Sequence, residues 1–292
     1  MKITLIEANQ DLGVKVDGAH LGPHILTSEL KDENIEVLIV NKPKCIKEKS
    51  KENLKKNLDS INTFDKDLYD TCLKVKENNK FPLVIGGDHS IAIASSLASL
   101  KKEKSLGIIW IDAHGDYNTF ETTRTGNLHG LPLAAVNDNC ELLTDFHKGN
   151  FYNHKNTVIV GGRDIDPWEM PNLEKDGIKI FTTEDIKKLG VKKVMDEAFK
   201  IASEGTNGVH ISYDIDIIDP KIAPGVSVPA INGINLDEAM DIVNELIINK
   251  EIIKSMDLVE FNPTRDKDNK TKNIALDILK KVIKNFTKLL FL

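Results

Sequence analysis

The sequence has few cysteines, and their spacing does not suit a structural role. Its 292 residues include three, Cys45, Cys72 and Cys140, an odd number without any C-x-x-C pair. Neither a disulfide framework nor a cysteine metal site is therefore indicated, and a reducing compartment fits best.

The sequence also lacks an excess of positive charge and any long apolar run. Its 39 Lys and Arg residues against 45 Asp and Glu residues give a formal net charge of −6, which offers no general attraction to nucleic acid or anionic lipid. No run approaches the roughly 18 apolar residues of a membrane span, and the first residues do not resemble a signal peptide. We therefore predict a cytoplasmic protein with neither a nucleic-acid nor a membrane partner.

Proline and glycine, with 10 and 18 residues, are too scarce for a fibrous or disordered chain. Because α/β folds of about 200–300 residues often form one domain, and no linker or repeat interrupts the chain, we predict a single domain over residues 1–292. The lysine-rich segment 42–56 is interpreted as a solvated loop and helix face. The apolar residues 289–292 either dock on the body or lie in a subunit contact.

Short β-branched runs alternate with longer stretches of helical spacing, which is typical of a mostly parallel sheet with helices on both faces. The predicted strands cover residues 3–6, 35–40, 82–85, 106–111, 157–160, 178–181, 208–213 and 252–259. The predicted helices cover residues 51–78, 90–102, 185–203, 236–249 and 273–289.

Acids and histidines follow five of the predicted strands. The carboxyl ends of parallel strands share one edge of a sheet, where ligands bind, so segments far apart in sequence can meet there. The segments are Gly86-Gly87-Asp88-His89-Ser90, Asp112-Ala113-His114-Gly115-Asp116, Arg163-Asp164-Ile165-Asp166, Asp214-Ile215-Asp216 and Glu260-Phe261-Asn262.

The spacing of these acids indicates a metal site. Side chains two apart on extended backbone point the same way, so Asp112, His114 and Asp116 should form one row, and Asp214 and Asp216 a second. Carboxylates converging at a dry sheet edge would raise one another's pKa unless cations were present. Two divalent ions balance the four negative charges, and an oxygen-rich set with two imidazoles suits Mn²⁺ best, although Co²⁺, Ni²⁺ or Zn²⁺ could bind the same atoms.

Such a site predicts hydrolysis without a protein nucleophile. Two ions about 4 Å apart can share a water, lower its pKa and present it to a carbon electrophile. Departure of an amine then requires a nearby proton donor, and the candidate is His129 in Gly126-Asn127-Leu128-His129-Gly130.

Other polar residues have simpler interpretations. Asp88 and Ser90 are typical helix caps, and Glu260 alone could be a buried ion-pair partner. Five histidines without comparable surroundings are interpreted as surface or satisfied structural residues, namely His20, His24, His147, His154 and His210.

Taken in order, these segments resemble the ureohydrolase family, which includes arginases and agmatinases. The metal signatures are Gly-Gly-Asp-His at 86–89, Asp-Ala-His-x-Asp at 112–116 and Ser-Tyr-Asp-x-Asp-x-x-Asp-Pro at 212–220. The resemblance implies a three-layer α/β/α fold with a mostly parallel central sheet, a binuclear manganese centre and a homo-oligomer, either a trimer or a hexamer.

The resemblance also implies two overlapping sets of metal ligands, in which Asp112 and Asp214 bridge the ions. One Mn²⁺ would be held by His89, Asp112, Asp116 and Asp214, and the other by Asp112, His114, Asp214 and Asp216.

Further roles follow from the same resemblance. Asp116 would orient the attacking hydroxide, His129 matches the proton-shuttle position, and Glu260 matches the carboxylate that holds the substrate guanidinium.

The resemblance to residues that bind the amino-acid end favours L-arginine over agmatine. Asn118, Thr123, Thr125 and Asn127 have the spacing with which arginases bind the substrate carboxylate, and Asp166 matches the contact to the α-ammonium. The predicted reaction is hydrolysis of L-arginine to L-ornithine and urea. The alternative is an agmatinase or another guanidino or formimino hydrolase.

Several positions depart from the family pattern. Thr125 replaces a frequent Ser, while Arg124 beside it is unusual and could either supply a cation for the substrate carboxylate or point to solvent. Val228 stands where Thr commonly supports the guanidinium-binding glutamate, and Ser227 could compensate. Trp168 stands where a small residue is common, which could narrow the mouth of the site.

Two alternatives belong to other classes of protein. The Asp-x-His and Gly-Asp elements loosely resemble binuclear phosphoesterases, but those enzymes separate the two elements by a long crossover, whereas here they overlap at 112–116. A non-enzymatic binding module would not need every predicted ligand together with the shuttle histidine.

Overall fold

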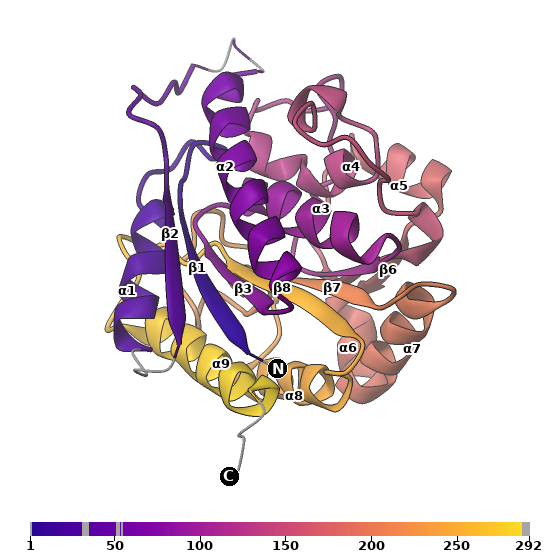
Figure 1. The fold of residues 1–292 in the computed structure, drawn as a ribbon. Coiled ribbons are helices and arrows are strands. Elements are labelled where there is room, and N and C mark those ends of the chain that lie inside the picture. Colours follow the sequence, from indigo (N-terminus) through magenta and orange to yellow (C-terminus); the bar gives the residue numbers. More distant parts are fainter. Residues whose placement is uncertain (1, 31–34, 51–52, 54, 288–292) are drawn as a thin grey trace.

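A parallel sheet forms the centre of the protein. The computed structural model describes residues 2–30, 35–50, 53 and 55–287. Within these residues the strands pair in the order β2-β1-β3-β8-β7-β4-β5-β6, and all neighbours are parallel. Helices cover both faces, giving the predicted three-layer α/β/α fold (Figure 1).

Each of the eight predicted strands is present, with ends shifted by a few residues at most. Their bounds are β1 (Ile3–Asn9), β2 (Glu36–Asn41), β3 (Phe81–Gly86), β4 (Gly107–Ile111), β5 (Thr157–Gly162), β6 (Lys179–Thr182), β7 (Val209–Asp214) and β8 (Ile253–Val259).

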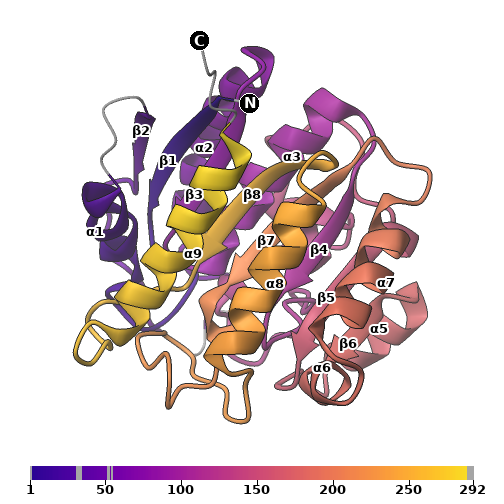
Figure 2. The same ribbon diagram turned by 90° about the horizontal axis from the view of Figure 1, so that it is seen from below.

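The helices divide between the two faces of the sheet (Figures 1 and 2). One face carries α2 (Leu58–Glu77), α3 (Ala92–Glu103), α4 (Pro132–Val136) and α5 (Met170–Asp176). The other carries α1 (Gly22–Glu29), α6 (Thr183–Leu189), α7 (Val191–Ser203), α8 (Leu236–Ile248) and α9 (Lys270–Phe286).

Several helix predictions need correction. The helix predicted over 185–203 is two helices, because Gly190 takes φ 84° between α6 and α7. The helix predicted from residue 51 begins only at Leu58. The short helices α1, α4 and α5 were not predicted; each has proline in its first turn, where a missing N–H costs nothing. The predicted docking or subunit contact of residues 289–292 lies outside the described residues.

Two apolar clusters, one on each face of the sheet, hold the layers together. The strands β3, β4 and β7 are buried along their whole length, so their near-continuous apolar runs pack on helices on both sides. The rigid centre of the sheet therefore fixes the positions of the segments that follow these strands. None of the helices within the described residues has the length and apolar character that a bilayer crossing requires.

Candidate metal centre and substrate pocket

The five predicted segments meet at one edge of the sheet. They follow β3, β8, β7, β4 and β5, which are consecutive neighbours in the strand order. The carboxyl ends of these parallel strands bring together residues from positions 86 to 262, as predicted from their placement.

His89 lies among three of the predicted acids. Its Nδ1 atom is 3.0 Å from Asp112 Oδ2, 3.1 Å from Asp116 Oδ2 and 3.1 Å from Asp214 Oδ2. The imidazole is buried, with 1% of the side chain exposed. Four residues from the ends of three strands thus surround one point.

His114 lies beside a second group that shares Asp112. Its Nδ1 atom is 3.4 Å from Asp112 Oδ1 and 3.1 Å from Asp216 Oδ2. Each oxygen of Asp112 therefore faces a different histidine. Ligand atoms of His89, Asp112 and Asp116, and likewise of Asp112, His114 and Asp216, lie within 4.8 Å of one another, close enough to hold an ion in each group.

The backbone that gathers these side chains is not the extended row predicted from their spacing. β4 ends at Ile111, and the chain then turns, with Asp116 in the left-handed region at φ 48°. His114 N donates to Asp112 Oδ1 at 2.7 Å, which closes the first turn. Asp216 N likewise donates to Asp214 Oδ1 at 2.7 Å at the start of a 3-10 helix. The predicted geometry is wrong because tight turns, not continued strands, aim the carboxylates.

The chemistry of the donor set fits divalent cations. The buried His89 Nδ1 has no hydrogen-bond partner, although three carboxylate oxygens surround it. Burial, and then repulsion from Asp112, raises the pKa of Asp116 to about 6. Burial, Asp216 and Asp112 raise the pKa of Asp214 well above its usual range. Cations would relieve this repulsion, and carboxylate oxygens with imidazole nitrogens are typical ligands of Mn²⁺.

A chain of buried polar groups contacts His89 at Nε2, the ring nitrogen opposite the one that faces the acids. The sequence analysis does not predict this chain. His89 Nε2 lies 2.8 Å from Ser212 Oγ, and Ser212 Oγ donates to Asp257 Oδ1 at 2.5 Å. Asp257 also contacts His210 Nε2 at 3.0 Å. Since the Ser212 hydroxyl proton goes to Asp257, its oxygen accepts the Nε2 proton of His89, so the neutral imidazole carries its lone pair at Nδ1, the atom that faces the three carboxylates. Ser212 lies two residues before Asp214 on β7, and this alternation was the available signal.

The Trp110 ring restrains the same imidazole. The two rings stack with centroids 4.0 Å apart and planes within 8°, and Trp110 Nε1 donates to Asp112 Oδ2 at 2.9 Å. One fully buried aromatic side chain thus contacts a residue of each group.

His129 and Glu260 form a pair next to the acids. His129 Nδ1 lies 3.0 Å from Glu260 Oε1, which also accepts from His89 N at 2.9 Å. Glu260 takes φ 67° directly after β8, and its buried Oε2 atom has no hydrogen-bond partner. Burial would lower the pKa of His129, but the hydrogen bond and charge of Glu260 outweigh burial and raise it.

A pocket of about 220 Å³ opens beside the two groups and is lined by all the residues predicted to bind the amino-acid end of the substrate. Those lining residues are Asn118, Thr123, Thr125, Asn127 and Asp166. Glu260, predicted to hold the guanidinium, lies buried next to His129.

Glu169, which the sequence did not single out, connects the two loops that line this pocket. It is 2% exposed and accepts hydrogen bonds from Tyr117 N at 2.8 Å and Asp166 N at 2.9 Å. Asn118 Nδ2 bridges Asp166 at 3.0 Å and Glu169 at 3.3 Å. Burial raises the pKa of Glu169 to about 8. Its position three residues after Asp166, on the same turn, was the available signal.

The Val228 side chain cannot hydrogen-bond to Glu260, and among the described residues Ser227 does not hydrogen-bond to Glu260 in its place. Val228 lines the pocket, whereas Ser227 Oγ accepts from Asn262 Nδ2 at 3.1 Å. Among the described residues, Glu260 is positioned by His89 and His129 instead.

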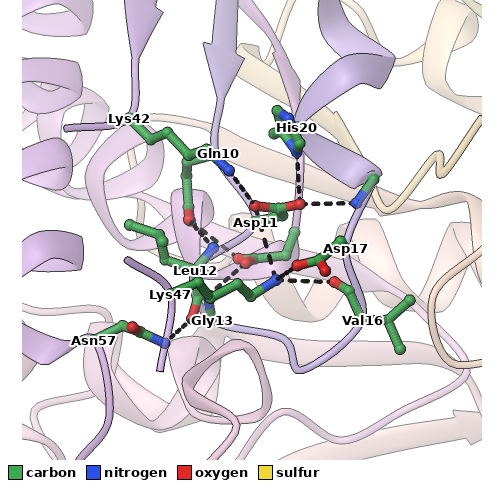
Figure 3. A network of polar contacts seen from close by, with 12 residues as sticks. Gln10, Asp11, Leu12, Gly13, Val16, Asp17, His20, Lys42, Lys47 and Asn57 are labelled. Atoms are coloured by element: carbon green, nitrogen blue, oxygen red, sulfur yellow. Dashed lines mark hydrogen bonds and ion pairs between the residues drawn. The ribbon is translucent and has the colours of Figure 1, made fainter. Parts of the chain in front are cut away.

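The loop 10–18 is tethered through Asp11 (Figure 3). Asp11 is fully buried and accepts hydrogen bonds from Lys42 Nζ at 2.8 Å and Gly18 N at 2.9 Å, and its Oδ2 lies 2.6 Å from His20 Nδ1. Lys47 Nζ donates to the Val16 carbonyl at 3.0 Å.

The tethered loop contacts both sides of the candidate centre. Gly13 N donates to Asp88 Oδ2 at 2.6 Å, and the Gly13 carbonyl accepts from His129 N at 3.1 Å. The interpretation of segment 42–56 as solvated is wrong for two of its lysines, because only 9% of the Lys47 side chain is exposed and Lys56 is buried. Lys56 donates to the Thr125 carbonyl, so the segment also reaches the pocket loop.

The five histidines interpreted as structural all have partners outside the two His/Asp groups, and His210 contacts Asp257, which also accepts from Ser212. The pairs are His20 with Asp11, His24 with Glu7, His147 with Tyr69 and Asn150, His154 with Asn137, and His210 with Ser255 and Asp257.

Comparison with known proteins agrees with this geometry. The model of the arginase family matches residues 1–284. An arginase from Bacillus subtilis (strain 168) is 36% identical over 293 residues, covering 96% of this chain and 97% of the relative. The native structure of an arginase from Bacillus caldovelox superposes with a TM-score of 0.90 at 33% identity and covers 99% of both chains. The arginase from Entamoeba histolytica in complex with L-ornithine gives a TM-score of 0.88 at 30% identity and covers 97% of both chains.

Proposed function

The chain is a hydrolase of the arginase family, and from this premise we propose that it hydrolyses L-arginine to L-ornithine and urea. The observation that carries the proposal is the pair of His/Asp groups sharing Asp112, next to a pocket lined by hydroxyl, amide and carboxylate groups. A related arginase was solved with L-ornithine, the product expected here.

We propose two Mn²⁺ ions per chain as the cofactor. His89, Asp112, Asp116 and Asp214 would hold one, and Asp112, His114, Asp214 and Asp216 the other. When bound, the ions would supply positive charge and a water of lowered pKa. The unpartnered His89 Nδ1 and the absence of thiolate among these residues support this choice of ion over structural zinc.

The chain's own residues would orient the substrate and move a proton. Glu260 Oε2 is buried and unpartnered, so it can accept hydrogen bonds from the substrate guanidinium. Asp116 can accept a hydrogen bond from the attacking water. As the bond between the guanidinium carbon and the departing nitrogen breaks, His129, whose pKa is raised by Glu260, can donate the proton that the ornithine amine requires.

The pocket supports a substrate with an α-amino-acid end. We propose that Asn118, Thr123, Thr125 and Asn127 bind the α-carboxylate and that Asp166 binds the α-ammonium. Agmatine lacks the carboxylate and would leave these groups without a partner, which favours L-arginine over the agmatinase alternative.

The proposal is tested by comparing L-arginine, agmatine and formiminoglutamate as substrates of the manganese-loaded protein. We expect urea from L-arginine at the highest kcat/KM. Urea released from agmatine but not from L-arginine would reverse the substrate assignment.

The remaining predictions about the whole protein also stand as proposals. We infer that residues 1–292 act as one domain, that the chain forms a trimer or hexamer, and that it works in the cytoplasm. Sedimentation equilibrium would measure the oligomeric state.

A further inference from the structure

Arg124 and Trp168 join the two loops that line the pocket. The Arg124 guanidinium carbon lies 4.5 Å from the centroid of the Trp168 ring, a cation–π distance. Arg124 stands between the lining residues Thr123 and Thr125, and Trp168 follows the lining residue Asp166 by two positions. The stacked pair therefore connects the loop proposed for the α-carboxylate with the loop proposed for the α-ammonium.

Stacking leaves the hydrogen-bonding edge of the guanidinium free. In the part of the chain that the structure describes, Arg124 makes neither a hydrogen bond nor an ion pair with another side chain. Both residues are exposed, Trp168 at 52%. A guanidinium held by a cation–π contact keeps its planar fork of donors, and this fork matches the two oxygens of a carboxylate.

The pocket lining offers hydroxyl and amide groups to a carboxylate but neither Lys nor Arg. The carboxylates of Asp164 and Asp166 also line it, and their charge suits an ammonium group and opposes a carboxylate. Arg163 does not line this pocket, and its Nη2 atom donates to the Asp216 carbonyl at 2.7 Å and to the Ala230 carbonyl at 2.9 Å.

We propose that Arg124, held against the Trp168 ring, is a specificity-determining residue that binds the α-carboxylate of the substrate and selects amino-acid guanidines over decarboxylated ones. Trp168 is a positioning residue, which restrains the guanidinium before the substrate arrives. The inference rests on the proposed hydrolysis of L-arginine. It identifies Arg124 as the cation that distinguishes L-arginine from agmatine at that site.

Kinetics with two substrates isolate the carboxylate. Arg124→Gln should raise KM for L-arginine roughly tenfold with little change in kcat, because one charge-assisted contact is lost. For L-argininamide, whose neutral amide replaces the carboxylate, KM should stay at the wild-type value. Arg124→Lys should recover part of the loss, and Trp168→Leu should give a smaller rise in KM for L-arginine alone.

The matched control is Lys179→Gln, since Lys179 forms another cation–π pair, 4.6 Å from the Phe181 ring, at the start of β6. This variant should keep the wild-type KM for both substrates. An unchanged KM for L-arginine in Arg124→Gln, or an equal rise for L-argininamide, would overturn the inference.

Binding without turnover separates failure of this inference from failure of the proposed function. L-ornithine and putrescine, which lacks the carboxylate, can be titrated into the manganese-loaded protein by calorimetry. Arg124→Gln should weaken only L-ornithine binding. The wild-type protein could release no urea from L-arginine while Arg124→Gln still weakens only L-ornithine binding. In that case the proposed reaction fails and the role of Arg124 stands. Equal binding of L-ornithine by both proteins rejects the role of Arg124 whether or not urea forms.

Discussion

At the residue scale, the free lone pair of His89 Nδ1 depends on a proton held at Nε2 by Ser212. Ser212→Ala removes that acceptor without leaving a charge unpaired. We expect manganese affinity to fall by about 10–100-fold, as for other residues that orient a metal ligand. The free energy of unfolding should fall by only about 1–3 kcal/mol. Competition with a chelating dye measures the affinity, and urea denaturation measures the stability.

Ser95→Ala is the matched control for Ser212→Ala. Ser95 Oγ also donates to the buried Asp257, at 2.6 Å, but it does not contact His89. This variant should keep the wild-type manganese affinity. An equal loss of affinity in both variants would show that Asp257 alone, and not the orientation of His89, controls binding.

The proposed division between metal-holding and proton-moving histidines is also tested residue by residue. His114→Asn should reduce manganese content and activity together, because His114 lies among the clustered acids. His129→Asn should keep the manganese content and lower kcat by about 100-fold or more, typical of losing a general acid. Metal content is measured by atomic emission after gel filtration. Similar metal loss in both variants contradicts the division.

Site residues that directly follow a strand could be predicted from the sequence. Residues that support them from within other strands or loops could not. The convergence of His89, Asp112 and Asp214 could be predicted because parallel strands end at one edge. Asp257 lies within a buried strand, where its side chain gave no separate signal, whereas Ser212 stood in the 212–220 signature without a role assigned to it. The stacking of Arg124 on Trp168 depends on the conformations of two loops, which local pattern does not determine.

At the scale of elements, the connection between β3 and α3 packs directly on the loop 10–18. A Cβ atom on Gly87 would lie 1.7 Å from the Gln10 carbonyl oxygen, a backbone atom that cannot move alone. Gly87→Ala should therefore lower the free energy of unfolding by at least about 3 kcal/mol. Gly130→Ala is the control, because a Cβ there meets nothing within 4 Å. Urea denaturation of both variants decides, and a small loss for Gly87→Ala would contradict the predicted clash.

The strands could be predicted more fully than the helices for a physical reason. Strands such as β4 are apolar along their length because both faces of the sheet are covered, so a short run is enough to mark them. Helices α4 and α5 span only 5 and 7 residues, too short for a clear 3.6-residue period. The break at Gly190 was missed because apolar spacing continues on both sides of it.

At the scale of the whole molecule, Asp11 couples the N-terminal loop to acid stability. Burial alone would raise the pKa of Asp11, but hydrogen bonds from Lys42 and Gly18 and the charge of Lys47 outweigh burial and lower it from 3.8 to about 2. The folded pKa lies below the unfolded one, so the stabilisation is complete above pH 3.8 and is lost as the pH falls towards 2.

The stabilisation from Asp11 should be about 2 kcal/mol. Asp11→Asn should lower the free energy of unfolding at pH 7 and flatten its decline between pH 4 and 2, as urea titrations at each pH would show. Asp17→Asn is the control, since that carboxylate is 58% exposed and its pairs with Lys47 and Lys49 should contribute at most about 1 kcal/mol. Parallel pH profiles for wild type and Asp11→Asn would contradict the assignment.

Metal binding should stabilise the whole fold, because the clustered residues extend from three central strands, His89 after β3 and the acids after β4 and β7. Without cations, these buried carboxylates repel one another in the folded state but separate in the unfolded chain. Manganese at 100 times its Kd adds about 2.7 kcal/mol per site. The two sites together correspond to a rise in Tm of roughly 5–10 °C for a chain of this size. Differential scanning calorimetry with EDTA and with Mn²⁺ measures this rise.

Asp112→Asn should lose most of the rise in Tm, because Asp112 belongs to both groups, whereas His129→Asn should retain it. A rise of the same size in Asp112→Asn would mean that the stabilising ions bind elsewhere on the molecule.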